Sequence, residues 1–280
     1  MHFSFVAFAL LFMLEPNFFT TTFVFPILNL LVVFYKVFLF IKIPGAFGLA
    51  IICLTAFIRL LLHPFFKQQL ETSKKMQDLK PHLDRISHKH KDDKKRLQEE
   101  HMKLYQQAGI NPAAGCLFMI VQIPVFIALY NTLSLFLLNG NATKIISQIN
   151  KVLYHPALKI QTIDPWFFGF NLALAPNKAG HWYYYLLPVI TAILQYFQTA
   201  VMTPAAPTTP EVSVAKKDTP EVKDKKDNGG DFQKAMNMQM KFIFPLMIGY
   251  FSYTLPVGLS LYWNIFSLFS IIQYKKMKSS

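Results

Sequence analysis

Long apolar segments alternate with short, strongly polar segments along the chain. A bilayer core about 30 Å thick needs roughly 20 mostly apolar residues in an α-helix, and three of the segments meet that length. The last apolar segment, residues 242–274, is too long for one crossing, and Pro256 and Gly258 interrupt it in a way that favours a tight turn. The pattern predicts an all-α polytopic membrane protein whose five transmembrane helices cover residues 45–66, 112–138, 181–202, 242–255 and 257–274.

Basic residues lie mainly between the predicted spans. The chain carries 28 Lys and Arg against 15 Asp and Glu, and only 15% of its residues are charged, compared with roughly 25% in a soluble domain. Most of the Lys and Arg residues fall in segments 67–111, 203–241 and 275–280. Because basic loops stay on the cytoplasmic side, we expect the N-terminus outside and the C-terminus inside. The high apolar content also excludes a disordered chain, and two cysteines exclude a disulfide-rich scaffold.

The first 44 residues leave two interpretations open. Residues 23–41 are apolar and could form a sixth span, but Pro26, Asn29 and Lys36 favour a helix lying in the outer membrane interface. Residues 3–14 form an apolar run as long as a signal-peptide core, and the sequence leaves its cleavage open. We therefore expect residues 1–44 to contain an N-terminal apolar segment and an interfacial helix.

The polar segment 67–111 is rich in helix formers and predicts a cytoplasmic helical hairpin. An apolar stripe at helical spacing follows its first arm, at Met76, Leu79, Leu83 and Ile86. An arm about 30 Å long exceeds what a linker needs, which favours a docking or lid role over a solvated connection. Its histidines lack the Cys or carboxylate partners of a metal site, so we expect no metal or cofactor. The other connections are expected to be an extracytoplasmic loop over 139–180, a flexible cytoplasmic loop over 203–241 and a short basic tail over 275–280.

Arg59 is the informative charge, because it lies inside the first predicted span. An unpaired arginine near the bilayer centre costs from ~2.5 to more than 10 kcal/mol, and an acidic residue on a neighbouring span usually relieves that cost. The other predicted spans contain no Asp or Glu. Arg59 is therefore expected to face a water-filled cavity or a partner that brings a negative charge.

Polar residues on the other spans fit such a cavity. Thr55 lies one turn before Arg59, and Gln122 lies inside the second span. Two further sets recur at helical spacing, namely Thr191, Gln195 and Gln198 on the third span and Ser260, Trp263, Asn264, Ser267 and Ser270 on the fifth. Each of these residues alone could equally form a hydrogen bond between helices. Together with the unpaired arginine they favour a hydrophilic groove.

Three motifs resemble the YidC-type membrane protein insertases of bacteria, mitochondria and chloroplasts. The motifs are FGLAIICLTAFIRLLLHPFFKQQ, LYQQAGINPAAGCLFMIVQIPVFIALYNTL and PVGLSLYWNIFSLFSIIQ. The resemblance runs through most of residues 20–275 and implies a five-span core with a groove open to the cytoplasm and to lipid. The groove positions that it implies are Thr55, Arg59, Gln122, Tyr262 and Trp263, and the polar stripes add Gln195, Gln198 and Asn264 as candidates.

The resemblance implies a protein that inserts and helps to fold newly made membrane proteins in the plasma (inner) membrane of a bacterium. Its expected partners are newly made membrane proteins and the lipid bilayer, with the ribosome and the Sec translocon as further candidates and no specific nucleic acid. We expect no enzyme activity, because the sequence has neither a nucleotide-binding GxxxxGK[ST] motif nor a catalytic pair on a span. A small channel or transporter that uses the same polar cavity is the alternative.

Overall fold

Helices make up most of the chain that the structure describes, which confirms the predicted helical class. The computed structural model describes residues 16–90, 93–109, 114–137, 142–202 and 239–279. The α-helices are α2 (Phe25–Phe40), α3 (Ala46–Leu61), α4 (His63–Asp78), α5 (Lys80–Lys89), α6 (Lys94–Gln107), α7 (Ala114–Leu137), α8 (Ala142–Lys151), α9 (Leu186–Met202), α11 (Phe244–Thr254) and α12 (Val257–Ser279). Two π-helical turns, η1 (Thr20–Val24) and η5 (Gln239–Ile243), lead into α2 and α11.

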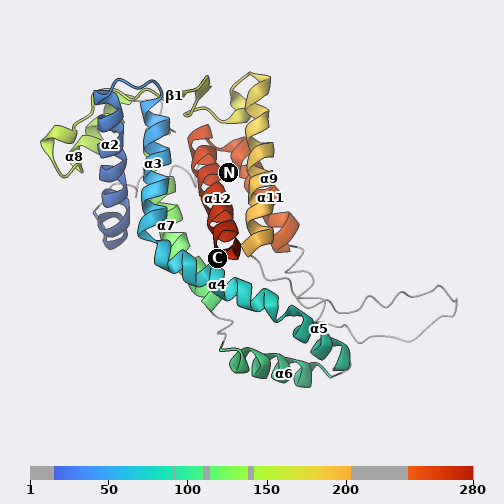
Figure 1. Cartoon of the computed structure of the whole chain (residues 1–280). Helices are drawn as coiled ribbons and strands as arrows, with labels where there is room; N and C mark the ends of the chain where they lie inside the picture. The colour runs from blue at the N-terminus through green and yellow to red at the C-terminus, as the bar shows by residue number, and fades with distance from the viewer. Residues whose placement is uncertain (1–15, 91–92, 110–113, 138–141, 203–238, 280) are drawn as a thin grey trace.

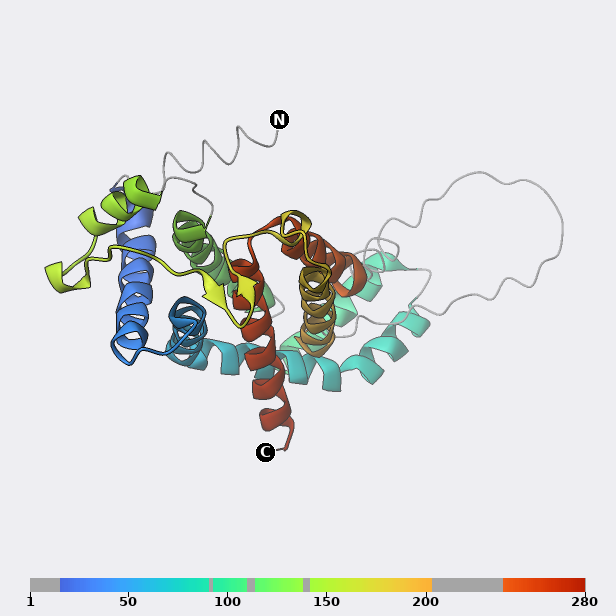
Figure 2. The same cartoon turned by 90° about the horizontal axis from the view of Figure 1, so that it is seen from above.

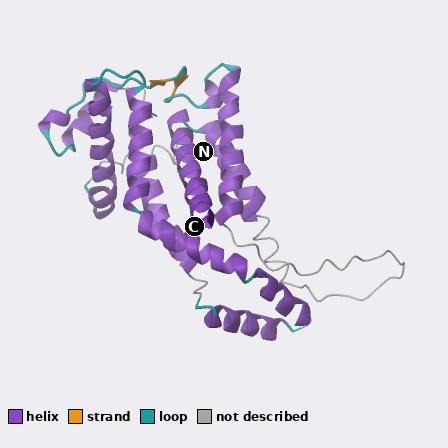
Figure 3. Ribbon diagram, viewed as in Figure 1, coloured by secondary structure: helices purple, strands orange, loops and turns teal. Residues whose placement is uncertain are grey.

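The helices form a bundle with two distinct ends (Figures 1 and 2). At one end, which we call the β1 end, strands β1 (Trp166–Phe167) and β2 (Phe170–Asn171) form a short antiparallel hairpin. Helices α4, α5 and α6 extend from the other end, which we call the hairpin end (Figures 1 and 3). Helices α2, α3, α7, α9, α11 and α12 lie between the two ends.

The first predicted span contains a bend. Helix α3 ends at Leu61, and α4 leaves it at an angle of 68°. Pro64 lies in the first turn of α4. A proline at this position has no N–H to donate, and its ring clashes with the carbonyl four residues earlier, so α3 cannot continue straight. The bend directs α4 away from the bundle.

The last apolar stretch forms two helices, with the break at the expected proline. Leu255 has an extended backbone, with φ −101° and ψ 160°, as the residue before a proline prefers. The first N–H groups of α12 are satisfied by the loop at the β1 end, where Val257 and Gly258 donate to the carbonyls of Leu174 and Leu172 at 3.0 and 2.9 Å. Helix α12 then continues to Ser279 and includes most of the segment expected as a tail.

The segment expected at the membrane interface forms the long helix Thr20–Phe40. Among the residues searched in the described part of the chain, it is the one continuous helix with the length and mean hydropathy, 2.2, of a membrane span. The helix lies beside α3 and crosses it obliquely (Figures 1 and 2). Asn29, which the sequence suggested as a mark of the interface, is buried, and its side chain hydrogen-bonds to Val152 and Tyr154. This packing weakens one reason for preferring an interfacial helix over a sixth span.

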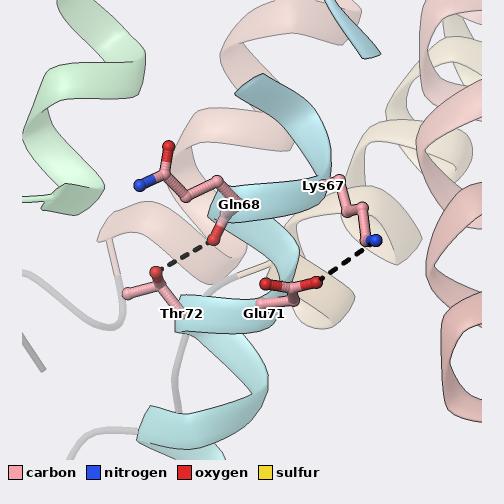
Figure 4. Close-up of polar contacts among 4 residues, drawn as sticks. All are labelled: Lys67, Gln68, Glu71 and Thr72. Atoms are coloured by element: carbon pink, nitrogen blue, oxygen red, sulfur yellow. Dashed lines mark hydrogen bonds and ion pairs between the residues drawn. The ribbon is translucent and has the colours of Figure 1, made fainter. Parts of the chain in front are cut away.

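The polar arm α4–α6 contains several contacts within single helices. In α4, Lys67 lies 3.8 Å from Glu71, and the Thr72 hydroxyl donates to the Gln68 carbonyl at 2.9 Å (Figure 4). Helix α6 is capped by the Asp93 carboxylate, which accepts from the backbone N–H of Arg96 at 3.0 Å. Helices α5 and α6 pack against each other and form the hairpin.

Candidate substrate site around Arg59

Arg59 lies in the last turn of α3 and is almost completely buried, with 1% of its surface exposed. Its guanidinium carbon lies 3.7 Å from the ring centroid of Phe66 and 4.3 Å from that of Phe266. One terminal nitrogen donates to the hydroxyl of Ser270 on α12. The bend after α3 brings the Phe66 ring of α4 against the guanidinium, and α12 supplies the adjacent Phe266 ring, which packs edge-on against Phe66 with 6.0 Å between ring centroids. The positive charge is thus held by two aromatic faces and one hydroxyl.

The Arg59 side chain has unsatisfied hydrogen-bond donors. Within the described residues, its Nε and Nη1 atoms have no acceptor, and no carboxylate lies within ion-pair distance. A buried charge whose donors are unsatisfied is unfavourable, since its lost hydration is not replaced. The Nε and Nη1 atoms of Arg59 can therefore donate to an anionic or other hydrogen-bond-accepting group.

A small pocket adjoins Arg59. Its lining comes from α3, α4, α7 and α12 and consists of Thr55, Ile58, Arg59, Leu62, Phe66, Val125, Tyr262 and Phe266. The free volume of about 10 Å³ is close to the space that one water molecule needs. The pocket as it stands is too small for a group larger than a water molecule.

Most of the other polar residues form contacts between helices. Thr191 of α9, Ser252 of α11 and Ser260 of α12 form a buried hydroxyl chain with separations of 3.1 and 2.7 Å. The Ser267 hydroxyl on α12 donates to Gln198 Oε1 on α9 at 2.6 Å. These contacts correspond to the helix–helix hydrogen bonds that the sequence left open as an alternative to a groove.

The structure brings three of the eight candidate groove residues together in the pocket, namely Thr55, Arg59 and Tyr262. The other candidates whose side chains the structure describes lie outside its lining. Trp263 is buried and stacks on Phe126 with 5.7 Å between ring centroids, and the Gln195 amide contacts Thr199 on its own helix. The described residues offer no hydrogen-bond donor to Asn264 Oδ1. Gln122 belongs to α7, and its side chain lies outside the described part of the structure.

The two aromatic walls are the part of the site that the sequence did not indicate. Phe66 and Phe266 are two of the chain's 28 phenylalanines, and each looks like an ordinary apolar residue of a span. Their meeting on one guanidinium, with the two rings packed edge-on at 6.0 Å between centroids, depends on the 68° bend and on the packing of α12 against α3. One signal in the sequence was the aromatic residue seven positions after Arg59 and two positions after the proline that bends the helix.

Comparison with known proteins identifies the family. Residues 38–280 match the family model described as the 60Kd inner membrane protein. The chain is 30% identical over 238 residues to a membrane protein insertase YidC of Oceanobacillus iheyensis, covering 82% of this chain and 75% of that protein. It is 33% identical over 250 residues to the chloroplast inner membrane protein ALBINO3 of Arabidopsis thaliana, covering 85% of this chain and 48% of that protein.

A third relative is the chloroplast inner membrane protein PPF-1 of Pisum sativum, which is 34% identical over 243 residues, or 83% of this chain and 49% of that protein. The chain thus spans about half the length of these chloroplast relatives. The matched region includes Arg59, the bend after α3 and both halves of the last apolar stretch. The chain belongs to the 60Kd inner membrane protein family, the YidC-type family that its motifs resemble.

Proposed function

We propose that this chain inserts newly made membrane proteins into a bilayer, with Arg59 attracting acidic residues of the incoming segment. The printed name of the Oceanobacillus iheyensis relative, a membrane protein insertase, supports this activity. The observation that carries the proposal is a buried arginine with two donor atoms that no described residue satisfies. An acidic substrate residue would supply both the missing charge and the missing acceptors.

A carboxylate can compete with the resting partners of Arg59. Charge-assisted hydrogen bonds are roughly twice as strong as neutral ones, and a cation–π contact contributes ~2 kcal/mol when it is desolvated. A carboxylate that reaches Arg59 therefore gives Nε and Nη1 the charge-assisted acceptors that they lack, in exchange for part of the contact with the Phe66 and Phe266 rings. The apolar flanks of the substrate then move into lipid, which supplies the driving force.

Helix α4 links this site to the polar arm. Phe66 lies in the first turns of α4, so a movement of the arm α4–α6 moves one aromatic wall of the pocket. At the far end of α12, the Tyr274 hydroxyl donates to Gln77 Oε1 on α4 at 3.0 Å and tethers the arm to the bundle. In this proposal the arm acts as a lid that opens the pocket when a substrate, a ribosome or a Sec translocon engages it.

The proposed topology places the hairpin end in the cytoplasm of a bacterium and the β1 end outside its inner membrane. The lysines and arginines of α4–α6 support this orientation, since basic segments remain cytoplasmic. Helix α11 has 11 residues between η5 and the break at Pro256, about 17 Å of α-helix. A segment this short beside the ~30 Å hydrocarbon core favours a locally thinned bilayer, which shortens the distance that a polar segment crosses.

The test compares two substrates in vesicles that contain the purified chain. One substrate carries an acidic segment that must cross the membrane, and the other carries the same segment with Asp and Glu changed to Asn and Gln. Arg59→Ala should reduce insertion of the acidic substrate about tenfold, since close charge pairs contribute ~1.5 kcal/mol or more. Arg59→Lys is the matched control and should retain much of the difference between the two substrates.

The two substrates also separate charge attraction from general damage. If Arg59→Ala reduces insertion of both substrates equally, the arginine supports the structure of the site, and the charge-attraction mechanism is wrong. If the unaltered chain inserts neither substrate in vesicles but conducts ions selectively, the insertase proposal itself fails and the channel alternative takes its place.

A further inference from the structure

The β1 end exposes a group of aromatic side chains that the insertion mechanism does not use. Phe168 is 83% exposed, and Trp182 is 74% exposed. Trp166 and Tyr185 are about half exposed and belong to the same loop. We refer to Trp166, Phe168, Trp182 and Tyr185 as the outer aromatic surface. Large aromatic residues at such exposure are uncommon on a water-facing loop and indicate an interaction site.

Phe168 occupies a backbone position that favours other residues. It lies with Gly169 in the two-residue turn between β1 and β2, and both have positive φ angles, 45° and 85°. Such turns prefer Asn, Asp or Gly, because a side chain with a positive φ is strained. The Phe168 ring packs edge-on against Phe167 at 4.7 Å between centroids, but most of its surface remains exposed, which leaves it available for a contact outside the chain.

The turn is attached rigidly to the bundle. The ring of Phe167 lies against the backbone of Gly48 on α3, so closely that a methyl group at Gly48 would come within 2.2 Å of it. On the other strand, the Phe170 ring contacts Tyr183 and Tyr184, and the Tyr184 hydroxyl accepts from the N–H of Asn171 at 2.7 Å. Phe168 and Trp182 are therefore presented by one connected unit.

The surface continues directly into the apolar face of α9. Helix α9 begins one residue after Tyr185. Its exposed apolar residues recur at helical spacing, at Leu186, Val189, Ile190, Ile193 and Phe197. In a membrane protein such a face contacts lipid, so the aromatic residues at its end lie at the level where the helix leaves the hydrocarbon core. Trp and Tyr are enriched at that level, because their rings are amphipathic.

We propose that the outer aromatic surface inserts into the headgroup region of the outer leaflet and anchors the β1 end of the bundle to the lipid. The occupant is the bilayer itself, because the surface is continuous with the lipid-facing side of α9 and carries few charges. This anchor would hold the loop that caps α12 at a fixed depth while the hairpin end moves. It does not depend on charge attraction by Arg59.

The first test measures depth with spin labels in vesicles of phosphatidylcholine and phosphatidylglycerol. The two native cysteines, Cys53 and Cys116, are replaced by Ala, and single labels are placed by Phe168→Cys and Trp182→Cys. Lys178→Cys is the control, since Lys178 is exposed in the same loop and carries a charge. Labels at 168 and 182 should collide more often with dissolved oxygen than with a water-soluble nickel chelate, and the label at 178 should show the reverse.

A second measurement uses the unaltered chain. Of its three tryptophans, Trp263 is buried, so quenching reports mainly on Trp166 and Trp182. Lipids brominated near their ester end should quench the fluorescence more than lipids brominated near the chain end, and aqueous acrylamide should quench it little. Strong quenching by acrylamide would place the surface in water and overturn the proposal. Protection from every quencher would show that protein covers the surface, which also contradicts a lipid anchor.

Phe168→Asn separates anchoring from folding. Asn adopts a positive φ more readily than Phe, so the thermal midpoint in detergent should stay the same or rise. The spin label at position 182 should become more accessible to the nickel chelate, because one anchor side chain is lost. An unchanged depth at position 182 would contradict the anchoring role of Phe168.

Discussion

The helical bundle and the arm α4–α6 use polar side chains in opposite ways. In the bundle, the hydrogen bonds join distant parts of the chain, with 211 residues between Arg59 and Ser270 and 69 between Gln198 and Ser267. In the arm, Thr72 bonds to a carbonyl four residues earlier, and Lys103 contacts Glu100 at 2.9 Å. Side-chain hydrogen bonds thus cross-link the bundle at several points, whereas the arm is joined to it through Tyr274 and Gln77 and carries further contacts within its own helices.

This difference predicts different mechanical behaviour. A local contact contributes only a few tenths of a kcal/mol to its own helix and does not resist movement of that helix as a unit. Contacts between distant elements must all break before the bundle can open, so the bundle should unfold cooperatively. Substitutions in the bundle should therefore change global stability, and substitutions in the arm should change its local opening.

The largest effect is expected at Gly48, where α3 meets the β-hairpin. Gly48→Ala adds a methyl group that would lie 2.2 Å from the Phe167 ring, so the hairpin must shift. Overpacking of this kind costs about 1–3 kcal/mol. The thermal unfolding midpoint of the purified chain in detergent should fall accordingly.

The double variant Gly48→Ala/Phe167→Ala provides the control for this clash. Because the second substitution removes the ring that the methyl group meets, the combined loss of stability should be smaller than the sum of the two single losses. Additive losses would mean that Gly48 is required for another reason.

The next effect is expected at Asn29, which links α2 to the loop at the β1 end. Its amide donates to the Val152 carbonyl at 3.1 Å, and its oxygen accepts from the Tyr154 N–H at 2.7 Å. Asn29→Leu leaves these backbone groups without partners, which costs about 1–3 kcal/mol. The thermal unfolding midpoint measures the change in stability. Asn150→Leu is the control, because the Asn150 side chain hydrogen-bonds to the backbone of Ile160, only ten residues along the chain. An equal loss from both variants would remove the distinction between distant and local contacts.

The sequence predicted the helical class and the absence of an acidic partner for Arg59 among the described residues, because both depend on composition. Twenty apolar residues need a helix in lipid, and a lone arginine without acidic residues in the other spans is visible without coordinates. The proline break at Pro256 was likewise a local property. These features depend on neighbouring residues in the sequence and can therefore be predicted without a structure.

The sequence could not predict which side chains surround Arg59. The regular spacing of serines on α12 was visible in the sequence. Which partner each serine bonds to depends on how α12 packs against three other helices, and the pairs are Ser260 with Ser252, Ser267 with Gln198, and Ser270 with Arg59. Phe66 and Phe266 are separated by 200 residues and have no individual signature. The hydrogen-bond partners of Asn29 were likewise not visible in the sequence, because they lie more than 120 residues away.

A smaller effect is expected at Ser252, the centre of the hydroxyl chain between α9, α11 and α12. Ser252→Ala removes its contacts to Thr191 and Ser260. Hydrogen bonds between membrane helices contribute ~0.6 kcal/mol on average, so the unfolding midpoint should fall slightly. Thr72→Ala in the arm is the comparison, since the Thr72 hydroxyl donates to the Gln68 carbonyl within its own helix. A larger loss of global stability from Thr72→Ala than from Ser252→Ala would contradict the contrast between the two regions.

The smallest expected effect is a change in the stability of the α5–α6 hairpin with pH. His101 on α6 is partly buried against α5, where its Nε2 lies 3.3 Å from the Ser87 hydroxyl, and this burial lowers the pKa of His101 below its ordinary 6.5. The packed hairpin thus favours the neutral imidazole, and its stability is complete above pH 6.5 and decreases as the pH falls through the lowered pKa. Hydrogen exchange in residues 80–107 should become faster at pH 5.5 than at pH 7.5, while the unfolding midpoint of the bundle changes little. His101→Gln, whose side chain cannot be protonated, should remove this local pH dependence. If hydrogen exchange in the arm becomes equally fast at pH 5.5 in His101→Gln and in the unaltered chain, another group is responsible.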